Sequence, residues 1–503
     1  MFYPLIDITH ADPIILSGEY NVVSARISSN ERYVVFLTYG PSRLVSYDRQ
    51  TNESTILAFF PGEPEFSNFS ITGDDQFVVF PASVNGPSAE INRVPIDGSA
   101  PPTRTVSIDT DPGGLNYFIT PDGQTLVYLD GTGNNIDIKA VPVIGGERIF
   151  LNEGLENGVI YNFALSPNGD YVTYILEDPD RYTITQRILV PLAGGSPTVI
   201  NPEGSYTSAF EVAFAESVDA LFFTAYTEEE GTRLYRVPLD GAPGTVITPP
   251  NRSVYDDFQL SADEQYLLYR EFDQGTQTLQ RLTVSDNTIT PVTTLTGQGT
   301  IFFNVAEEAP LAFIQTSAFV SPIYTATHSS AVFAPPSSAI VLATLTGEEF
   351  GNSFAETQST HDGATLVIRQ GAFNQEGSLY SVDGDGSAEP VTLFAEPDVR
   401  DFFIAENQQE IFFQTRNASG AAYHKVPIGG GTVTPLLQSA GKDTFINTVG
   451  LLSNSDLLLI DSNGEADPRL DSLYLLEGVV TTEPATVETY LPLIRYELAT
   501  PRE

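Results

Sequence analysis

A short turn followed by an apolar strand recurs along most of this chain, and this repeat limits what the chain can fold into. In the clearest copy, residues 166–169 read Ser-Pro-Asn-Gly, and residues 171–174 form a β-branched and aromatic run. Proline presets φ for a turn and Asn-Gly tolerates left-handed backbone, whereas β-branched and aromatic residues suit a pleated, half-buried surface. The stretch therefore predicts a tight turn and the strand that follows it.

Ten copies of this strand align on one apolar anchor residue each. Successive anchors lie between 44 residues (Val34 to Val78) and 54 residues (Ala312 to Leu366) apart. A second large apolar residue follows two positions after every anchor, which is the period-2 pattern of a buried strand face. The anchors are Val34, Val78, Leu126, Val172, Leu221, Leu267, Ala312, Leu366, Ile411 and Leu457.

A Val-Pro pair marks the end of a third strand, 15 to 18 residues after the anchor in five copies. A fourth short strand follows, as at residues 245–247. Four strands in about 47 residues is typical of a β-propeller blade, and such blades bury their faces only against their neighbours. We therefore predict an all-β fold: a single ring of about ten four-stranded blades over residues 1–503, closed by the termini. Two smaller propellers, or fewer regular blades, are the alternative.

The Ser-Pro-Asn-Gly and Thr-Pro-Asp-Gly turns, each followed by an apolar strand and then Val-Pro-(Ile/Leu)-x-Gly, resemble the repeats of TolB-like propellers. Those repeats are similar in architecture to the WD-repeat class. The resemblance covers nearly the whole chain, and its short motifs specify a fold more than an activity. It implies a periplasmic scaffold that binds a protein or peptide in its central funnel.

The termini offer more strand candidates than one ring needs. Residues 13–16 have the spacing of an outer strand and are expected to join the last blade, built from residues 457–460 and 472–476; residues 485–488 could take the same place. Residues 1–17 are thus predicted as closing or exchanged strands, and residues 489–503 as a C-terminal extension. The candidate intersubunit contacts, by edge addition to a neighbouring copy, are Tyr3, Pro4, Leu5, Ile6, Tyr490, Leu491, Pro492, Leu493 and Ile494.

The search for chemistry yields no catalytic motif, and we predict no catalytic residue, no metal site and no cofactor. The absence of cysteine excludes disulfides and thiol catalysis. The four histidines are scattered and are predicted to lie at the surface: His10, His328, His361 and His424. Three Asp-x-Asp pairs are read as turn residues, with Ca²⁺ ligands as the weaker alternative: Asp109/Asp111, Asp178/Asp180 and Asp383/Asp385. The Pro/Ser/Ala-rich residues 328–338 are predicted as a loop insertion.

The charge of the chain excludes some partners. With 65 acidic and 23 basic residues, the net charge is −42, which repels nucleic acid and anionic lipid. No apolar run reaches the roughly 18 residues of a membrane helix, so membrane insertion is not expected. The N-terminus shows no signal-peptide pattern, but few lysines, no cysteine and many Ser/Thr residues favour an extracellular or cell-surface location, with the periplasm as the alternative.

Three functions remain open at this point. We expect a non-catalytic, extracellular or cell-surface structural propeller that self-assembles through its terminal strands, so that its protein partners are other copies of itself. One alternative is the periplasmic protein- or peptide-binding scaffold that the TolB-like resemblance implies. The other is a propeller enzyme that uses carboxylates to act on a glycan.

Overall fold

The computed structural model describes residues 14–479 with short gaps, and every structural statement below refers to that part of the chain. The gaps are residues 18–20, 41, 61–68, 85–87, 110–115, 133–134, 156–157, 178–184, 203–204, 207–210, 251, 298, 306–311, 321–324, 334–339, 348–352, 373–376, 384–389, 406, 418–419, 441–444, 453–455, 463–471 and 477–478.

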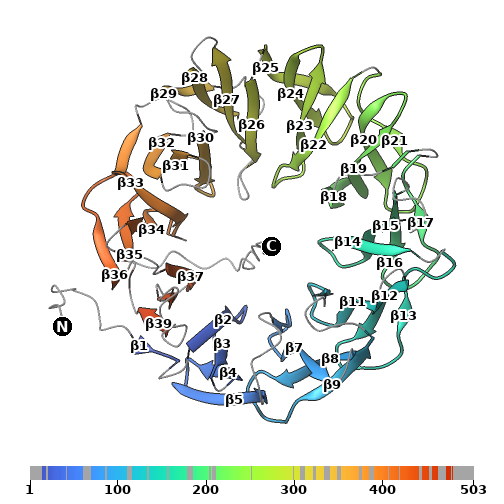
Figure 1. Cartoon of the computed structure of the whole chain (residues 1–503), viewed down its shortest axis with the longest axis vertical. Helices are drawn as coiled ribbons and strands as arrows, with labels where there is room; N and C mark the ends of the chain where they lie inside the picture. Colours follow the sequence, from blue (N-terminus) through green and yellow to red (C-terminus); the bar gives the residue numbers. More distant parts are fainter. Residues whose placement is uncertain are drawn as a thin grey trace.

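The described residues form β-strands and turns, with no α-helix and one short 3-10 turn at Glu216–Val218, so the all-β prediction is confirmed. The strands make eight four-stranded sheets and one seven-stranded sheet, and every pair of neighbouring strands is antiparallel. In Figure 1 the sheets follow one another around a circle in chain order.

The first seven sheets each take four consecutive strands. They are β2 (Asn21–Ile27), β3 (Tyr33–Tyr39), β4 (Ser42–Asp48) and β5 (Glu53–Phe60); β6 (Ser70–Ile71), β7 (Phe77–Val84), β8 (Ser88–Pro95) and β9 (Thr103–Ile108); β10 (Tyr117–Ile119), β11 (Thr125–Thr132), β12 (Asn135–Pro142) and β13 (Ile149–Phe150); β14 (Val159–Leu165), β15 (Tyr171–Glu177), β16 (Thr185–Pro191) and β17 (Thr198–Val199); β18 (Val212–Ala215), β19 (Ala220–Thr227), β20 (Gly231–Pro238) and β21 (Thr245–Val246); β22 (Ser253–Leu260), β23 (Tyr266–Asp273), β24 (Thr276–Thr283) and β25 (Ile289–Thr296); β26 (Gly299–Val305), β27 (Ala312–Val320), β28 (Thr325–Phe333) and β29 (Ile340–Gly347).

The seven-stranded sheet is two such units that share one long strand. Its strands are β30 (Ser353–Ser359), β31 (Thr365–Ala372), β32 (Gly377–Asp383), β33 (Val391–Ile404), β34 (Glu410–Asn417), β35 (Gly420–Pro427) and β36 (Thr434–Ala440). Residues 391–394 of β33 pair with β32, whereas residues 399–404 pair with β34. The strand therefore ends one four-stranded unit and begins the next.

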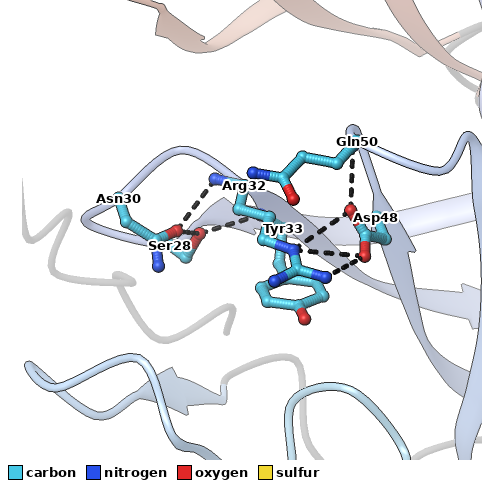
Figure 2. Close-up of polar contacts among 6 residues, drawn as sticks. All are labelled: Ser28, Asn30, Arg32, Tyr33, Asp48 and Gln50. Atoms are coloured by element: carbon cyan, nitrogen blue, oxygen red, sulfur yellow. Dashed lines mark hydrogen bonds and ion pairs between the residues drawn. The ribbon is translucent and has the colours of Figure 1, made fainter.

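Side-chain hydrogen bonds explain why the repeated turn carries a hydroxyl residue at its first position and Asp or Asn at its third. In the first sheet, Ser28 Oγ donates to Asn30 Oδ1 and accepts from the backbone N–H of Tyr33 at 2.9 Å, and Arg32 N–H also donates to Asn30 (Figure 2). Arg32 then crosses to the end of β4 and pairs with Asp48 at 2.7 Å. These side chains fix the geometry of the hairpin.

The core lies between successive sheets, as the repeat predicts. Each anchor whose side chain the structure describes is buried, and so is each residue two positions later. In one cluster, Val127 and Ile138 of the third sheet pack against Tyr174 and Ile188 of the fourth. Because each sheet covers its neighbour, no sheet would be stable alone.

The first and last parts of the chain meet in the terminal sheet, which we define as β37 (Phe445–Leu451), β38 (Leu457–Ser462), β39 (Ser472–Leu476) and β1 (Ile14–Ile15). The predicted pairing with the last blade is present in the described part of residues 13–16: Ile14 faces Leu475 and Ile15 faces Tyr474. The terminal sheet also contacts the first sheet, through an ion pair of 2.8 Å between Arg49 and Asp456.

The predicted loop insertion at residues 328–338 is wrong over residues 328–333, which belong to β28. This strand pairs with β27 on one side and β29 on the other. Val332 and Phe333 favour the extended backbone, and pairing on both sides keeps the run in a strand. The two prolines, Pro335 and Pro336, lie outside the described residues.

Candidate functional site

All nine candidate contact residues, at positions 3–6 and 490–494, lie outside the described residues. The structure does describe the outer strand to which the N-terminal segment leads. In β1, Ile14 and Ile15 are exposed, whereas the following Leu16 and Ser17 are buried. Leu16 N–H donates to the Leu473 carbonyl, and Ser17 Oγ accepts from Leu473 N–H at 3.1 Å. The strand is thus anchored at one end and presents apolar side chains at the other.

The outer edges of the sheets carry most of the exposed large apolar side chains. Two of them, Ile56 and Phe59, lie on β5 and are the most exposed among the outer strands at 53% and 61%. The others on outer strands are Ile14, Ile15, Phe150, Val199 and Val246. An outer strand offers unpaired backbone groups beside these side chains, so this rim is suited to strand addition.

The turns at one end of the sheets are tied to one another, and this feature was not predicted from the sequence. Asp75, the fourth residue of its turn, accepts hydrogen bonds of 2.8, 2.7 and 2.8 Å from Ser29 N–H, Ser29 Oγ–H and Asn30 N–H of the preceding sheet. Ser217 N–H donates to Glu264 and His361 N–H donates to Gln408 in the same way. In each case an acid or amide with left-handed backbone occupies the fourth turn position.

Buried lysine–carboxylate pairs stabilise individual sheets. Lys139 lies 2.9 Å from Asp130 and 3.0 Å from Asp137. Burial alone would lower the pKa of Lys139, but the hydrogen bonds to both carboxylates outweigh it, so this pKa is raised and the lysine stays charged. Lys425 pairs with Glu410 at 3.1 Å and also donates to the Val479 carbonyl. Each of these lysines therefore neutralises a buried acid.

His424 is not a surface residue, so that prediction is wrong. Its ring stacks on Phe413 and Phe394 with centroid distances of 5.1 and 6.1 Å, and Nε2 lies 2.9 Å from Thr415 Oγ1. Burial lowers the pKa of His424 from 6.5 to about 4, so the ring is neutral near pH 7. In β35 positions 421, 423 and 425 are buried and positions 420, 422 and 424 are half-buried, so strand alternation alone did not indicate the stacking of His424.

The structure describes only part of the remaining histidines and acidic pairs. His361 is exposed in its turn, as predicted, and position 328 lies in β28, whereas His10 falls outside the described residues. Of the Asp-x-Asp pairs, Asp109 and Asp383 are described and their partners are not. Within the described ranges, no three His, Asp, Glu or Cys side chains converge to hold a metal ion. In the same ranges, the search for an apolar helix long enough to span a bilayer finds none.

Repeated four-stranded antiparallel sheets, stacked face to face around a circle, define this chain as a β-propeller-like repeat protein. Neither a protein-family model nor a curated protein matches the sequence.

Two solved structures show limited similarity. One is described as the crystal structure of the eukaryotic initiation factor, with 12% identity, a TM-score of 0.47, and coverage of 87% of this chain and 90% of that chain. The other comes from a structural and mechanistic analysis of two prolyl endopeptidases, with 12% identity, a TM-score of 0.36, and coverage of 72% and 56%. At these TM-scores the fold assignment rests on the sheets of this chain, and neither protein's activity is transferred to it.

Proposed function

We propose that this protein is a single closed propeller that acts as a non-catalytic structural subunit and assembles with other copies through its terminal strands. Ten blades result if the seven-stranded sheet counts as two units beside the eight four-stranded sheets. In this proposal β1 closes the ring as the outer strand of the last blade. The repeats would be TolB-like in kind, and the setting would be extracellular or at a cell surface.

One observation carries the assembly part of the proposal. The terminal sheet takes its four strands from β37, β38, β39 and β1. The apolar segments at residues 3–8 and 490–496 are therefore not needed to complete that sheet, although each reads as a strand. A strand-forming apolar segment outside a completed sheet is suited to pairing with the edge of another copy.

The contacts of the polar groups support a structural function rather than catalysis. The described acids on the turns, such as Asp75 and Glu264, accept hydrogen bonds from neighbouring backbone N–H groups. The buried acids Asp130 and Glu410 are paired with lysines. These carboxylates hold sheets together, and a glycosidase would need a pair of them facing a substrate.

The test compares the full chain with a variant that lacks residues 490–503. Sedimentation velocity and electron microscopy would measure the size and shape of the particles over a range of protein concentrations. We expect the full chain to form oligomers or polymers and the truncated chain to form smaller ones. A full chain that stays monomeric at every concentration would refute the proposed function, and unchanged polymers after truncation would refute the part assigned to the C-terminal strand.

A further inference from the structure

The outer strand β5 lacks the features that normally protect a sheet edge. It has eight residues and lies at the end of its sheet, with β4 as its described neighbour. Among the other long outer strands, β9, β25 and β36 contain a charge or a proline that opposes edge pairing, at Arg104, Pro291 and Pro435. Strand β29, like β5, contains no proline, and it has no charged residue. In β5 the one charged residue is Glu53, at its start, and the strand contains no proline.

β5 also presents a local concentration of exposed apolar side chains. Of the eleven exposed large apolar residues in the described ranges, Ile56 and Phe59 lie on β5, and Ile14 and Ile15 lie on β1, an outer strand of the terminal sheet. Ile56 faces Val45 across the β4–β5 pair, and Val45 belongs to the buried cluster that joins the first sheet to the terminal sheet. The patch therefore lies on the side of the first sheet that is turned towards β1.

We propose that β5 of one copy receives residues 3–8 of a second copy as an additional strand. This inference rests on the proposed function and names the receiving surface that the proposed function leaves open. Ile56 and Phe59 would pack against the apolar side chains of the incoming segment, and the outer backbone groups of β5 would pair with its backbone.

The chemistry of the segment fits this edge. Of residues 3–8, Tyr-Pro-Leu-Ile-Asp-Ile, Asp7 alone is charged, in a chain whose net charge is −42, so the rest of the segment adds no repulsion between two acidic copies. Pro4 lacks an N–H and cannot continue a ladder on one side, so the added strand would end the sheet. A bulge at Leu57 leaves residues 53–56 as a regular run of β5, which matches residues 3–6 in length.

This contact is heterologous, because the donor segment and the accepting strand are different surfaces of the same chain. Each copy donates once and accepts once. Reciprocal exchange between two copies gives a closed dimer, whereas donation from each copy to the next gives rings or open filaments.

The test uses one variant for each half of the contact. The acceptor variant carries Ile56→Lys and Phe59→Lys, and the donor variant carries Leu5→Asp and Ile6→Asp. A matched control carries Val199→Lys and Val246→Lys, which change two exposed outer-strand residues (41% and 43%) with the same change in charge. Circular dichroism checks that all variants fold, and sedimentation velocity measures self-association.

We expect the acceptor and donor variants to self-associate about a hundredfold more weakly than the full chain, since two apolar side chains leave the contact. The control should associate like the full chain. A mixture of the two variants should form one-to-one dimers that do not grow, because each variant retains the half that the other lacks.

If the acceptor variant assembled like the full chain, β5 would not be the receiving edge, while the proposed function would stand. The same conclusion would follow if the mixture failed to dimerise although the full chain polymerised. A full chain that is monomeric throughout would overturn the proposed function and this inference together.

Discussion

At the residue scale, the fourth position of a turn has a role beyond its own hairpin. Asp75 adopts left-handed backbone with φ of 55° and aims its carboxylate at the turn of the preceding sheet. Where this position is glycine, as at Gly169, the turn instead packs directly on Pro121 of the preceding turn. A Cβ added to Gly169 would lie 3.2 Å from Pro121 Cδ. Both arrangements bring adjacent turns into register.

We predict that Asp75→Ala destabilises the protein by about 2 kcal/mol, because three hydrogen bonds to a carboxylate are lost between two sheets. Asp240→Ala is the control, since Asp240 accepts from Ala242 N–H within its own exposed turn. Urea unfolding of both variants measures the effect. Equal free energies of unfolding for the two variants would contradict the intersheet role of Asp75.

His424 gives the stability of the protein a pH dependence. Burial lowers the pKa of His424 from 6.5 to about 4, so as pH falls from about 6.5 the unfolded chain takes up a proton first. Stability is therefore lost between about pH 6.5 and pH 4, by up to about 3 kcal/mol from this residue. His424→Phe should remove this contribution, and unfolding curves measured across this pH range for both proteins would reveal the difference. Parallel pH profiles would show that His424 is not buried in its neutral form.

At the scale of elements, the hairpins could be predicted from the sequence and the contacts between them could not. The anchor residues and the Val-Pro strand ends form patterns within short stretches of chain, and such patterns are visible in a single sequence. The sharing of β33 between two units depends on its pairing with β32 at one end and with β34 at the other, and such pairing leaves no local pattern in the sequence. The Asp75 contact joins residues 45 and 46 positions apart, a separation that carries no local signal.

Close approach of turns leaves no room for a side chain at Gly73. A Cβ at Gly73 would overlap the carbonyl oxygen of Pro121 in the next turn, whereas a Cβ at Gly429 would meet nothing within 4 Å. We predict that Gly73→Ala lowers the free energy of unfolding by about 1–3 kcal/mol, and that Gly429→Ala changes it little. Thermal unfolding of the two variants is the measurement. A Gly73→Ala protein as stable as the Gly429→Ala protein would mean that the turns do not pack in this way.

At the scale of the whole molecule, the candidate contact segments could be chosen from the sequence, because apolar strands left over from the repeat are visible there. The strand proposed to accept them, β5, could not be predicted from the sequence, since the exposure of Ile56 and Phe59 depends on which sheet covers β5. Because the net charge is −42, association between copies depends on the ionic strength. Like-charged copies repel one another, and salt screens this repulsion.

We predict that self-association strengthens as ionic strength rises from about 0.01 to about 0.15 M, over which the Debye length falls from about 30 to about 8 Å. An apolar contact between acidic copies gains from screening, whereas a contact made of ion pairs would lose from it. Sedimentation velocity across this salt range measures the trend. Weaker association at higher salt would point to charged contacts in place of the apolar strand.

Closure of the propeller by β1 is the claim on which the rest depends, because it leaves the terminal segments available for assembly. The chain has no cysteine, so Ile15→Cys with Tyr474→Cys introduces a single pair at positions that face each other across β1 and β39. Facing residues on antiparallel strands are close enough for a disulfide, and Ile15→Cys with Val246→Cys, in β21 of the fifth sheet, is the control.

After mild oxidation of dilute protein, mobility on a non-reducing denaturing gel is the measurement. We predict a fast-migrating monomer with an internal disulfide for the facing pair, and no such species for the control. A facing pair that stays reduced, or that forms only disulfide-linked dimers, would contradict closure of the ring within one chain.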